Sequence, residues 1–386
     1  MKRERAAIAV AIGVVAIATA WLFAPLLIGA LTGAPRFFEW DVPEQYWPDL
    51  VYLCRSLHQG ELPYWNPYDH GGYPYYADPQ ATIYSPLAWG ICAVAGPAPG
   101  LGWQEARVVI GFLCAGLFAL LWLRRLGASW AAASVGAVLL ESAPFMRHNW
   151  ELNLTSAIGF FPMVLWALER TLQERRLRDA ALLALAEAML VWSGSPPAAW
   201  LAGSFTALYA AGRLIELGRG DGRAAVLRAV SLLALAAVLV VGLCAAVLAP
   251  GLTLSQHSVQ AGRSYESIAD GALSLDHLSA LVWPRDGNHL YVGWIALALA
   301  PLAFWRRARF PGRRVLALGA VMAILLALGN AGWLFRIAFD VVPGVRLFRL
   351  PHRYELWLGP CVAALAAGGL DAVREQLRER MPPWLP

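Results

Sequence analysis

Charged residues and cysteines are scarce in this sequence. Only 15% of its 386 residues are charged, whereas 59% are hydrophobic. A soluble chain cannot cover that much apolar surface with so few charges, and a disordered chain is far less hydrophobic. Five cysteines in so long a chain also exclude a disulfide-rich scaffold. The composition therefore predicts a polytopic integral membrane protein.

Lysine is almost absent, since Lys2 is the only one, and arginine carries the positive charge. The net charge of +5 does not require a nucleic-acid partner, because basic loops also set the orientation of membrane proteins. No P-loop pattern occurs in the sequence, and this absence argues against an ATP-driven pump.

Apolar runs of spanning or nearly spanning length recur along the whole chain. The first extends from Ala6 to Leu31 and lacks an A-x-A cleavage site, so we interpret it as an uncleaved signal anchor. Nine more lie near residues 103–123, 128–147, 156–169, 179–193, 198–215, 225–249, 290–305, 314–335 and 354–370. We therefore expect an all-α polytopic membrane protein with about ten transmembrane helices.

These spans divide the chain into six parts: a signal-anchor span (1–31), a first outer loop (32–102), a transmembrane bundle (103–249), a second large outer loop (250–289), a further bundle (290–370) and a cytoplasmic tail (371–386). If the N-terminus is cytoplasmic, about two thirds of the 31 basic residues lie inside, as the positive-inside rule requires. All seven histidines and most acidic residues then lie outside. We expect any chemistry to occur on the outer face.

The first outer loop mixes aromatic, acidic and turn residues. Within residues 48–60, which begin with proline and end with glycine, apolar side chains recur at helical spacing. They are Leu50, Leu53, Cys54 and Leu57. This pattern predicts an amphipathic helix on the membrane surface. Residues 82–96 are apolar but short, and we expect a second interfacial helix there. Cys54 and Cys92 are able to bridge in an oxidising compartment, although nothing in their spacing demands it.

Several motifs follow one another in the order known from one protein family. The first loop holds Gly60-x-Leu62-Pro63-x-Trp65-Asn66-Pro67-Tyr68, Gly72-Tyr73-Pro74, Ala77-Asp78-Pro79-Gln80 and Tyr84-x-Pro86. Later come Ser193-Gly194-Ser195-Pro196, the 250–284 loop followed by Tyr291-x-Gly293, and Phe348-Arg349-Leu350-Pro351-His352-Arg353. Together these motifs resemble the YfhO-type bacterial membrane proteins. Relative to that family, the chain is shortened at its C-terminus.

The resemblance implies a GT-C-like glycosyltransferase of the bacterial inner (cytoplasmic) membrane. Such enzymes move a sugar from a polyprenyl-phosphate donor to a cell-wall polymer, lipid or protein acceptor on the outer face. The implied partners are the lipid-linked sugar donor, membrane lipids and further membrane proteins. The lack of an Asp-x-Asp pattern fits a lipid-linked donor better than a nucleotide-sugar donor.

Asp41 is the candidate catalytic base. It lies ten residues after Leu31, close to the membrane surface where a lipid-linked donor would be, and sugar transfer needs a carboxylate to take the acceptor's proton. Glu39 and Asp41 are two residues apart and would face the same way on an extended segment, so they are also candidates to share a divalent cation. The alternative is a solvated acidic stretch that precedes a helix.

Arg349 and Arg353 are the candidate phosphate ligands, because they lie four residues apart at the start of a span and the guanidinium fork suits phosphate. An ion pair with the acids of the first loop is the alternative. Arg263 is a weaker candidate for binding the phosphate. His352 is a candidate for binding the substrate.

Five residues of the first loop are candidates for binding the acceptor sugar. Aromatic rings stack on sugar faces, and polar side chains bind hydroxyl groups. The five are Trp65, Asp69, His70, Tyr73 and Asp78. Alternatively, the carboxylates brace turns and the aromatic residues form an interfacial belt.

Two other functions stay open. The C-terminal shortening favours a non-catalytic GT-C-like subunit or scaffold of a membrane complex. A transporter of a lipid-linked intermediate is the other alternative, although such proteins usually show internal repeats, and none is clear here.

Overall fold

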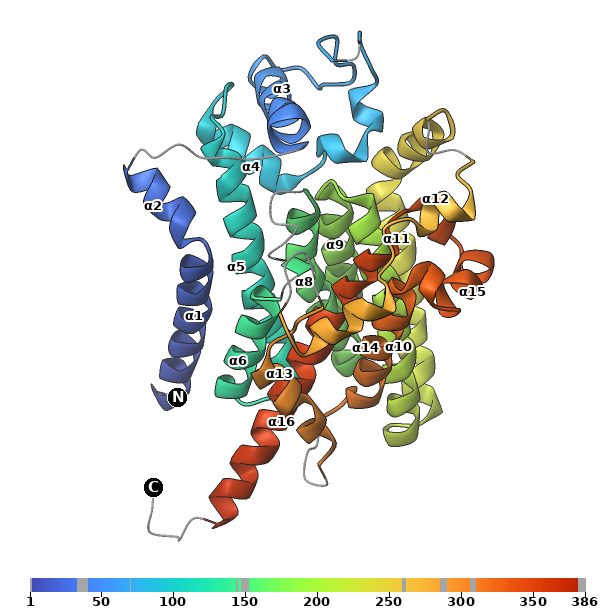
Figure 1. Cartoon of the computed structure of the whole chain (residues 1–386). Coiled ribbons are helices and arrows are strands. Elements are labelled where there is room, and N and C mark those ends of the chain that lie inside the picture. Colours follow the sequence, from blue (N-terminus) through green and yellow to red (C-terminus); the bar gives the residue numbers. More distant parts are fainter. Residues whose placement is uncertain are drawn as a thin grey trace.

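The computed structural model describes residues 2–32, 41–69, 71–143, 145–146, 153–258, 262–284, 290–305 and 310–380. In these ranges every regular element is helical, and the only strand-like pairing is a bridge between Asn66 and Tyr73. The helices form one bundle, and the described residues 41–101, which we call the first loop, cover one end of it (Figure 1). The predicted all-α class is confirmed.

The long helices are α1 (Lys2–Leu22), α5 (Gly102–Arg125), α8 (Asn153–Glu174), α9 (Leu177–Trp192), α10 (Pro196–Gly220), α11 (Arg223–Gln256), α14 (Arg313–Ala327) and α16 (Leu358–Arg380). The shorter ones are α2 (Ala24–Thr32), α3 (Trp47–His58), α4 (Pro86–Ala95), α6 (Trp130–Glu141), α12 (Tyr265–Ala269), α13 (Trp294–Leu299) and α15 (Leu334–Val341). A 3-10 helix, η8 (Pro351–Trp357), leads directly into α16.

Four of the described helical segments are long and apolar enough to cross a membrane. They are Lys2–Leu22, Gly102–Arg125, Arg223–Gln256 and Pro351–Glu379. This finding supports a membrane protein. Each of the ten apolar runs in the sequence overlaps helical residues, but several of these helices are short, so the count of ten spans stays a prediction.

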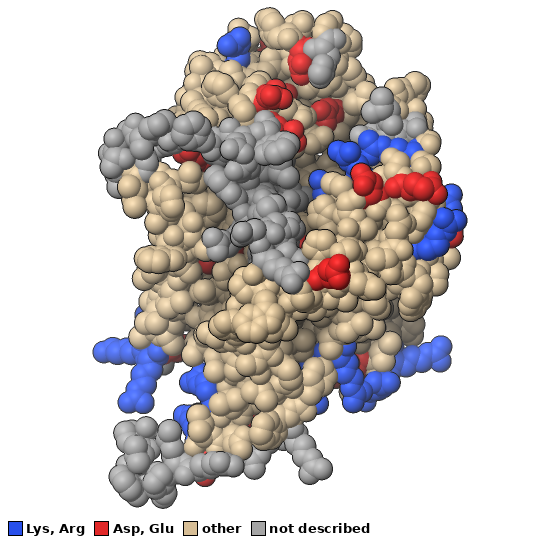
Figure 2. Space-filling view, viewed as in Figure 1, with Lys and Arg blue, Asp and Glu red and all other residues tan. Residues whose placement is uncertain are grey.

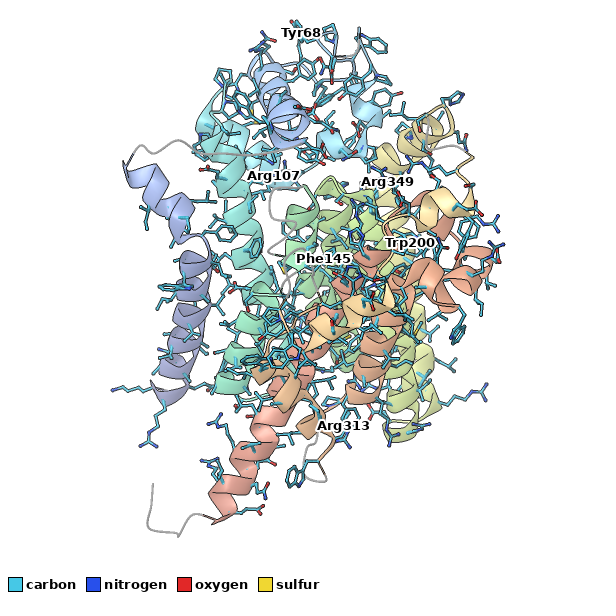
Figure 3. The ribbon with its side chains drawn as sticks, viewed as in Figure 1. Tyr68, Arg107, Phe145, Trp200, Arg313 and Arg349 are labelled. Carbon is cyan, nitrogen blue, oxygen red and sulfur yellow. A yellow bond between two sulfur atoms is a disulfide. The ribbon has the colours of Figure 1, made fainter. Side chains whose placement is uncertain are left out.

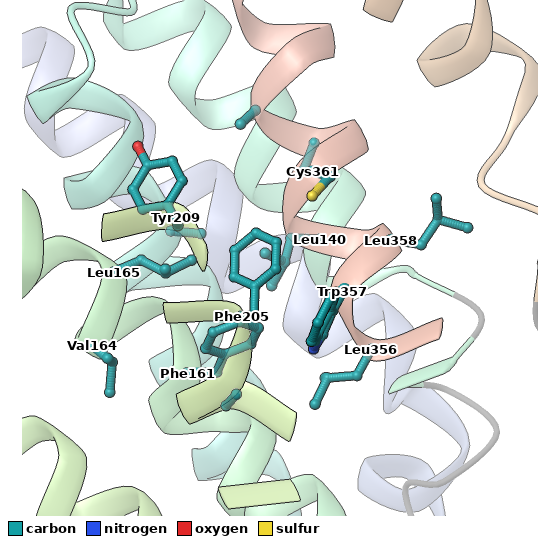
Figure 4. Close-up of a cluster of buried hydrophobic side chains, with 14 of the residues drawn as sticks. Leu140, Phe161, Val164, Leu165, Phe205, Tyr209, Leu356, Trp357, Leu358 and Cys361 are labelled. Atoms are coloured by element: carbon teal, nitrogen blue, oxygen red, sulfur yellow. The ribbon is translucent and has the colours of Figure 1, made fainter. Parts of the chain in front are cut away.

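The centre of the bundle is packed by rings from α8, α10 and η8 (Figure 4). Phe205 meets Phe161 edge to face, with ring centroids 5.6 Å apart, and the rings of Trp357 and Tyr209 also pack against it. The contact between α5 and α8 depends on glycine. A Cβ atom on Gly159 would lie 2.5 Å from the carbonyl oxygen of Gly111, so only a hydrogen at this position allows the two backbones to approach so closely.

The first loop has a hydrophobic cluster of its own, formed chiefly by α3, α4 and the turns between them. The amphipathic pattern places Leu50 and Leu53 of α3 in this cluster, and both are fully buried. A disulfide joins Cys54 of α3 to Cys92 of α4. The two predicted interfacial helices are therefore present as helices, and they are cross-linked to each other.

The end of the bundle opposite the first loop carries most of the visible basic residues, whereas most of the visible acidic residues lie nearer the first loop (Figure 2). A buried ion pair joins α8 to α10 there. Arg213 donates from Nε to Glu169 Oε1 over 2.7 Å and from Nη2 to Oε2 over 3.1 Å. Tyr209 and Gln173 also donate to this carboxylate, at 2.8 and 3.0 Å. We call this group the Glu169–Arg213 network.

Candidate functional site

The candidate site lies where the first loop meets the bundle. Asp41 directly precedes the helical turn Val42–Tyr46, which runs into α3. Tyr46 donates to Asp41 Oδ2 over 3.5 Å and accepts from Gln80 Nε2 at 3.2 Å. Asp41 itself is exposed, whereas the Tyr46 ring is buried. The carboxylate is therefore held at the rim of the site, open to an incoming molecule.

Arg353 faces this rim from η8. Burial and then the charge of Asp41 raise the pKa of the Tyr46 phenol, and Arg353 acts in the opposite sense, so all three groups are within electrostatic reach. Arg353 is also repelled by the charge of Arg349 and lies within electrostatic reach of the Asp41 carboxylate. The Nε atom of Arg353 is buried and has no hydrogen-bond partner. Two neighbouring guanidiniums, one with an unused donor, form an anion-binding arrangement.

The two arginines also line a cavity of about 290 Å³. Its remaining wall is largely aromatic and apolar, with Trp200 of α10 and Tyr354 of η8 among the residues that form it. Figure 3 shows Arg349 and Trp200 on the same side of the bundle. A cationic corner beside an apolar wall suits an amphipathic anion better than a free ion in water.

The backbone between the two arginines is unusual. Leu350 adopts a left-handed conformation (φ 70°), which is rare for a residue with a branched side chain. Its N–H donates to the carbonyl of Ile268 over 3.2 Å. Gly271 leaves room for this arrangement, since a Cβ atom there would lie 2.5 Å from Leu350 Cδ2. The 262–284 loop therefore fixes the position of the arginine segment.

A second group of polar side chains lies deeper beneath the first loop. Asp49 of α3 is buried, accepts from Tyr73 Oη at 3.4 Å, and has a second carboxylate oxygen without a partner. Burial, followed by the charges of Asp78 and Asp69, raises its pKa to about 7. Arg107 of α5 acts in the opposite sense on that pKa, so its guanidinium is within electrostatic reach of Asp49.

The raised pKa of Asp49 makes the stability of the protein depend on pH. Because the folded-state pKa of about 7 lies above the unfolded value of 3.8, this carboxyl favours the folded state fully below pH 4, and the contribution is lost as the pH rises through 7. We expect Asp49→Asn to gain about 3 kcal/mol more stability over wild type at pH 8 than at pH 5. Thermal unfolding in detergent at the two pH values measures this difference. The control variant Asp340→Asn, at an exposed position, should show no such difference between the two pH values. If Asp49→Asn gained equally at both pH values, the raised pKa of Asp49 would be contradicted.

Arg107 links the first loop to the bundle. It is almost completely buried, donates from Nη2 to the carbonyl of Ser193 over 3.3 Å, and keeps an Nε atom without a hydrogen-bond partner. Ser193 begins the Ser-Gly-Ser-Pro turn between α9 and α10. Figure 3 shows Arg107 directly beneath the first loop. Sequence reasoning missed Arg107, Asp49 and Tyr46, although an arginine five residues into an apolar helix was a signal available in the sequence.

The candidate acceptor-binding residues are spread over the first loop. Trp65 is 57% exposed and packs over Gly72, while the Tyr73 hydroxyl group is directed to Asp49. Asp78 accepts from the backbone N–H of Gln80 at 2.8 Å and so braces a turn, which is the alternative considered for it. Asp69 is half-buried, and its backbone carbonyl accepts a hydrogen bond from the N–H of Gly72. Exposed Tyr68 extends the aromatic surface at the outer tip (Figure 3).

For the remaining candidates, no hydrogen bond or ion pair to Arg349 or Arg353 is seen in the described part of the chain. His352 contacts the carbonyl of Gly271 through Nδ1 at 2.7 Å. Arg263 lies just before α12, and no hydrogen bond or ion pair connects it to the described part of the site. His70 and Glu39 lie outside the described residues. Within the described ranges, no three His, Cys, Asp or Glu side chains form a metal-binding group, so the proposed cation shared by Glu39 and Asp41 stays a prediction.

Comparison with known proteins does not assign the chain to a family. No protein-family model matches the chain, and a search of curated proteins finds no significant match.

Proposed function

We infer that the chain is a GT-C-like membrane glycosyltransferase, similar to the YfhO-type proteins, that moves a sugar from a polyprenyl-phosphate donor to an acceptor on the outer face of the membrane. The observation that carries this proposal is that the charges of Asp41 and Arg353 lie within electrostatic reach of each other where the first loop borders the bundle. A transferase of this kind needs a carboxylate for the acceptor and cations for the leaving phosphate.

The proposed reaction is a direct displacement. Asp41 takes the proton of the acceptor hydroxyl group as its oxygen forms a bond to the anomeric carbon. The bond between that carbon and the phosphate oxygen breaks, and the electron pair leaves with the polyprenyl phosphate. Arg349 and Arg353 stabilise the negative charge that grows on this phosphate, and the half-buried position of Arg353 strengthens the interaction because water screens it less.

The proposed topology has ten spans in a bacterial inner membrane, with the N-terminus in the cytoplasm and the first loop outside. The concentration of arginines at the end that holds the N-terminus supports this orientation. In it, the exposed rim at Asp41 is open to an acceptor in the outer compartment, while the apolar wall of the arginine cavity is available to the lipid chain of the donor.

Asp41→Asn tests the proposal. The protein in nanodiscs is incubated with a panel of polyprenyl-phosphate hexoses, and release of polyprenyl phosphate is measured. Because the amide cannot accept the proton, the variant should be slower by about 10²- to 10⁴-fold with unchanged thermal stability. Glu44→Gln, an exposed acid three residues away in the same turn, is the matched control and should keep the wild-type rate. A folded wild-type protein that releases no polyprenyl phosphate from any donor would favour the non-catalytic subunit.

A further inference from the structure

A second cavity borders the same 3-10 helix as the arginine cavity. Its wall comes from the end of α6, from residues 145–146, from α8 and from the junction of η8 with α16. Among the described residues that line it, every side chain is apolar except that of Glu355. A single carboxyl group in an otherwise apolar cavity is the usual form of a small-ligand site, where one polar group fixes the orientation of a hydrophobic molecule.

Among the described residues, Glu355 has no hydrogen-bond partner. The residue is only 2% exposed, and both of its carboxylate oxygens are buried without a hydrogen bond. No Lys, Arg or His of the described residues forms an ion pair with it. Leaving a buried carboxyl group unsatisfied destabilises the folded protein, and does so more strongly if the group is ionised. A group kept at this cost is suited to an external hydrogen-bond donor.

Pro162 lies inside α8 and has no N–H, so the carbonyl of Ile158 lacks its usual helical donor four residues later. Both residues line the cavity. Among the described lining residues, Glu355 is the only charged side chain, and none is a cation.

We propose that this cavity binds an aliphatic primary amine in its ammonium form. An ammonium group carries three donors and no acceptor, and its positive charge complements the carboxylate of Glu355. An alkyl chain fills the apolar wall formed by residues such as Leu140, Phe161 and Leu356. An alcohol of the same length fits the wall but lacks the charge, and a fatty acid presents a second carboxylate. The site is separate from the arginine cavity and does not depend on the proposed transferase activity.

The test compares three ten-carbon probes that differ only in their head groups: decylamine, decanol and decanoate. Binding to the protein in nanodiscs at pH 7.5 is measured by calorimetry, with empty nanodiscs subtracted. We expect decylamine to bind wild type at least about tenfold more tightly than decanol, and decanoate to bind more weakly than both. Glu355→Gln should bring decylamine and decanol to within about twofold of each other.

Two further variants keep the result interpretable. Glu187→Gln removes a different half-buried acid, in α9, that does not line the cavity, and it should keep the full preference for the amine. Glu355→Asp keeps the charge and should retain a preference for decylamine even if the Gln variant fails to fold. Equal binding of decylamine and decanol by wild type, or an unchanged preference in a folded Glu355→Gln protein, would overturn the proposal.

Discussion

Replacing Arg353 by glutamine is expected to slow sugar transfer by about 10²- to 10³-fold, because the leaving phosphate loses a half-buried cation that water screens less than an exposed one. Arg349 is exposed and also lines the cavity, so Arg349→Gln should reduce the rate by only about tenfold. Steady-state release of polyprenyl phosphate from the best hexose donor gives kcat and KM for each variant. A loss in kcat at nearly unchanged KM is the signature of a contact made chiefly in the transition state.

The matched control is Arg346→Gln. This arginine lies seven residues from Arg353, is exposed, and contacts Asp340 and the ring of Phe339 instead of the cavity. It should leave kcat unchanged. If Arg346→Gln lowers the rate as much as Arg353→Gln does, the effect is a general loss of positive charge and the assignment of Arg353 to the phosphate fails.

The second large effect is on stability. Arg213→Met should lower the free energy of unfolding by about 3–5 kcal/mol, since it leaves the fully buried Glu169 carboxylate without its cation. Methionine keeps most of the length of the side chain, so the lost charge and hydrogen bonds dominate the change. Thermal unfolding in detergent compares the variant with wild type at the same pH and protein concentration.

Two comparisons separate this cause from a general packing defect. Arg336→Met removes an exposed cation paired with Asp340, and such pairs contribute at most about 1 kcal/mol. Adding Glu169→Gln to Arg213→Met removes the buried charge as well and should restore much of the lost stability. A double variant as unstable as Arg213→Met would show that the Glu169 charge is not responsible.

The helices were predictable because their signal is local. Apolar runs and i, i+3, i+4 spacing depend only on neighbours in the chain, and Leu50 and Leu53 are buried as that spacing requires. The proline at the start of α3 and the glycine after its end likewise mark its limits. The shorter helices show the limit of this signal, since length alone does not decide which of them cross the bilayer.

The site was only partly predictable because its contacts are distant in sequence. Asp41 and Arg353 were both candidates from their residue types and positions, but their proximity depends on how the first loop lies on the bundle. Asp49 looked like an ordinary first-turn acid of a helix, and its pKa is raised by burial and by the charges of Asp78 and Asp69, which the folded loop brings within reach. The Cys54–Cys92 disulfide follows from the packing of α3 against α4, which no spacing rule specifies.

The left-handed backbone at Leu350 has a consequence for how the molecule opens. Such a conformation costs about 1–2 kcal/mol for a residue with a side chain, and the 3-10 helix that follows has weaker hydrogen bonds than α16. Amide protons of residues 352–357 should therefore exchange with solvent through local fluctuations, well before those of α16. Arg353 thus belongs to a segment that opens without global unfolding, and an anion bound to this arginine should slow the exchange of that segment.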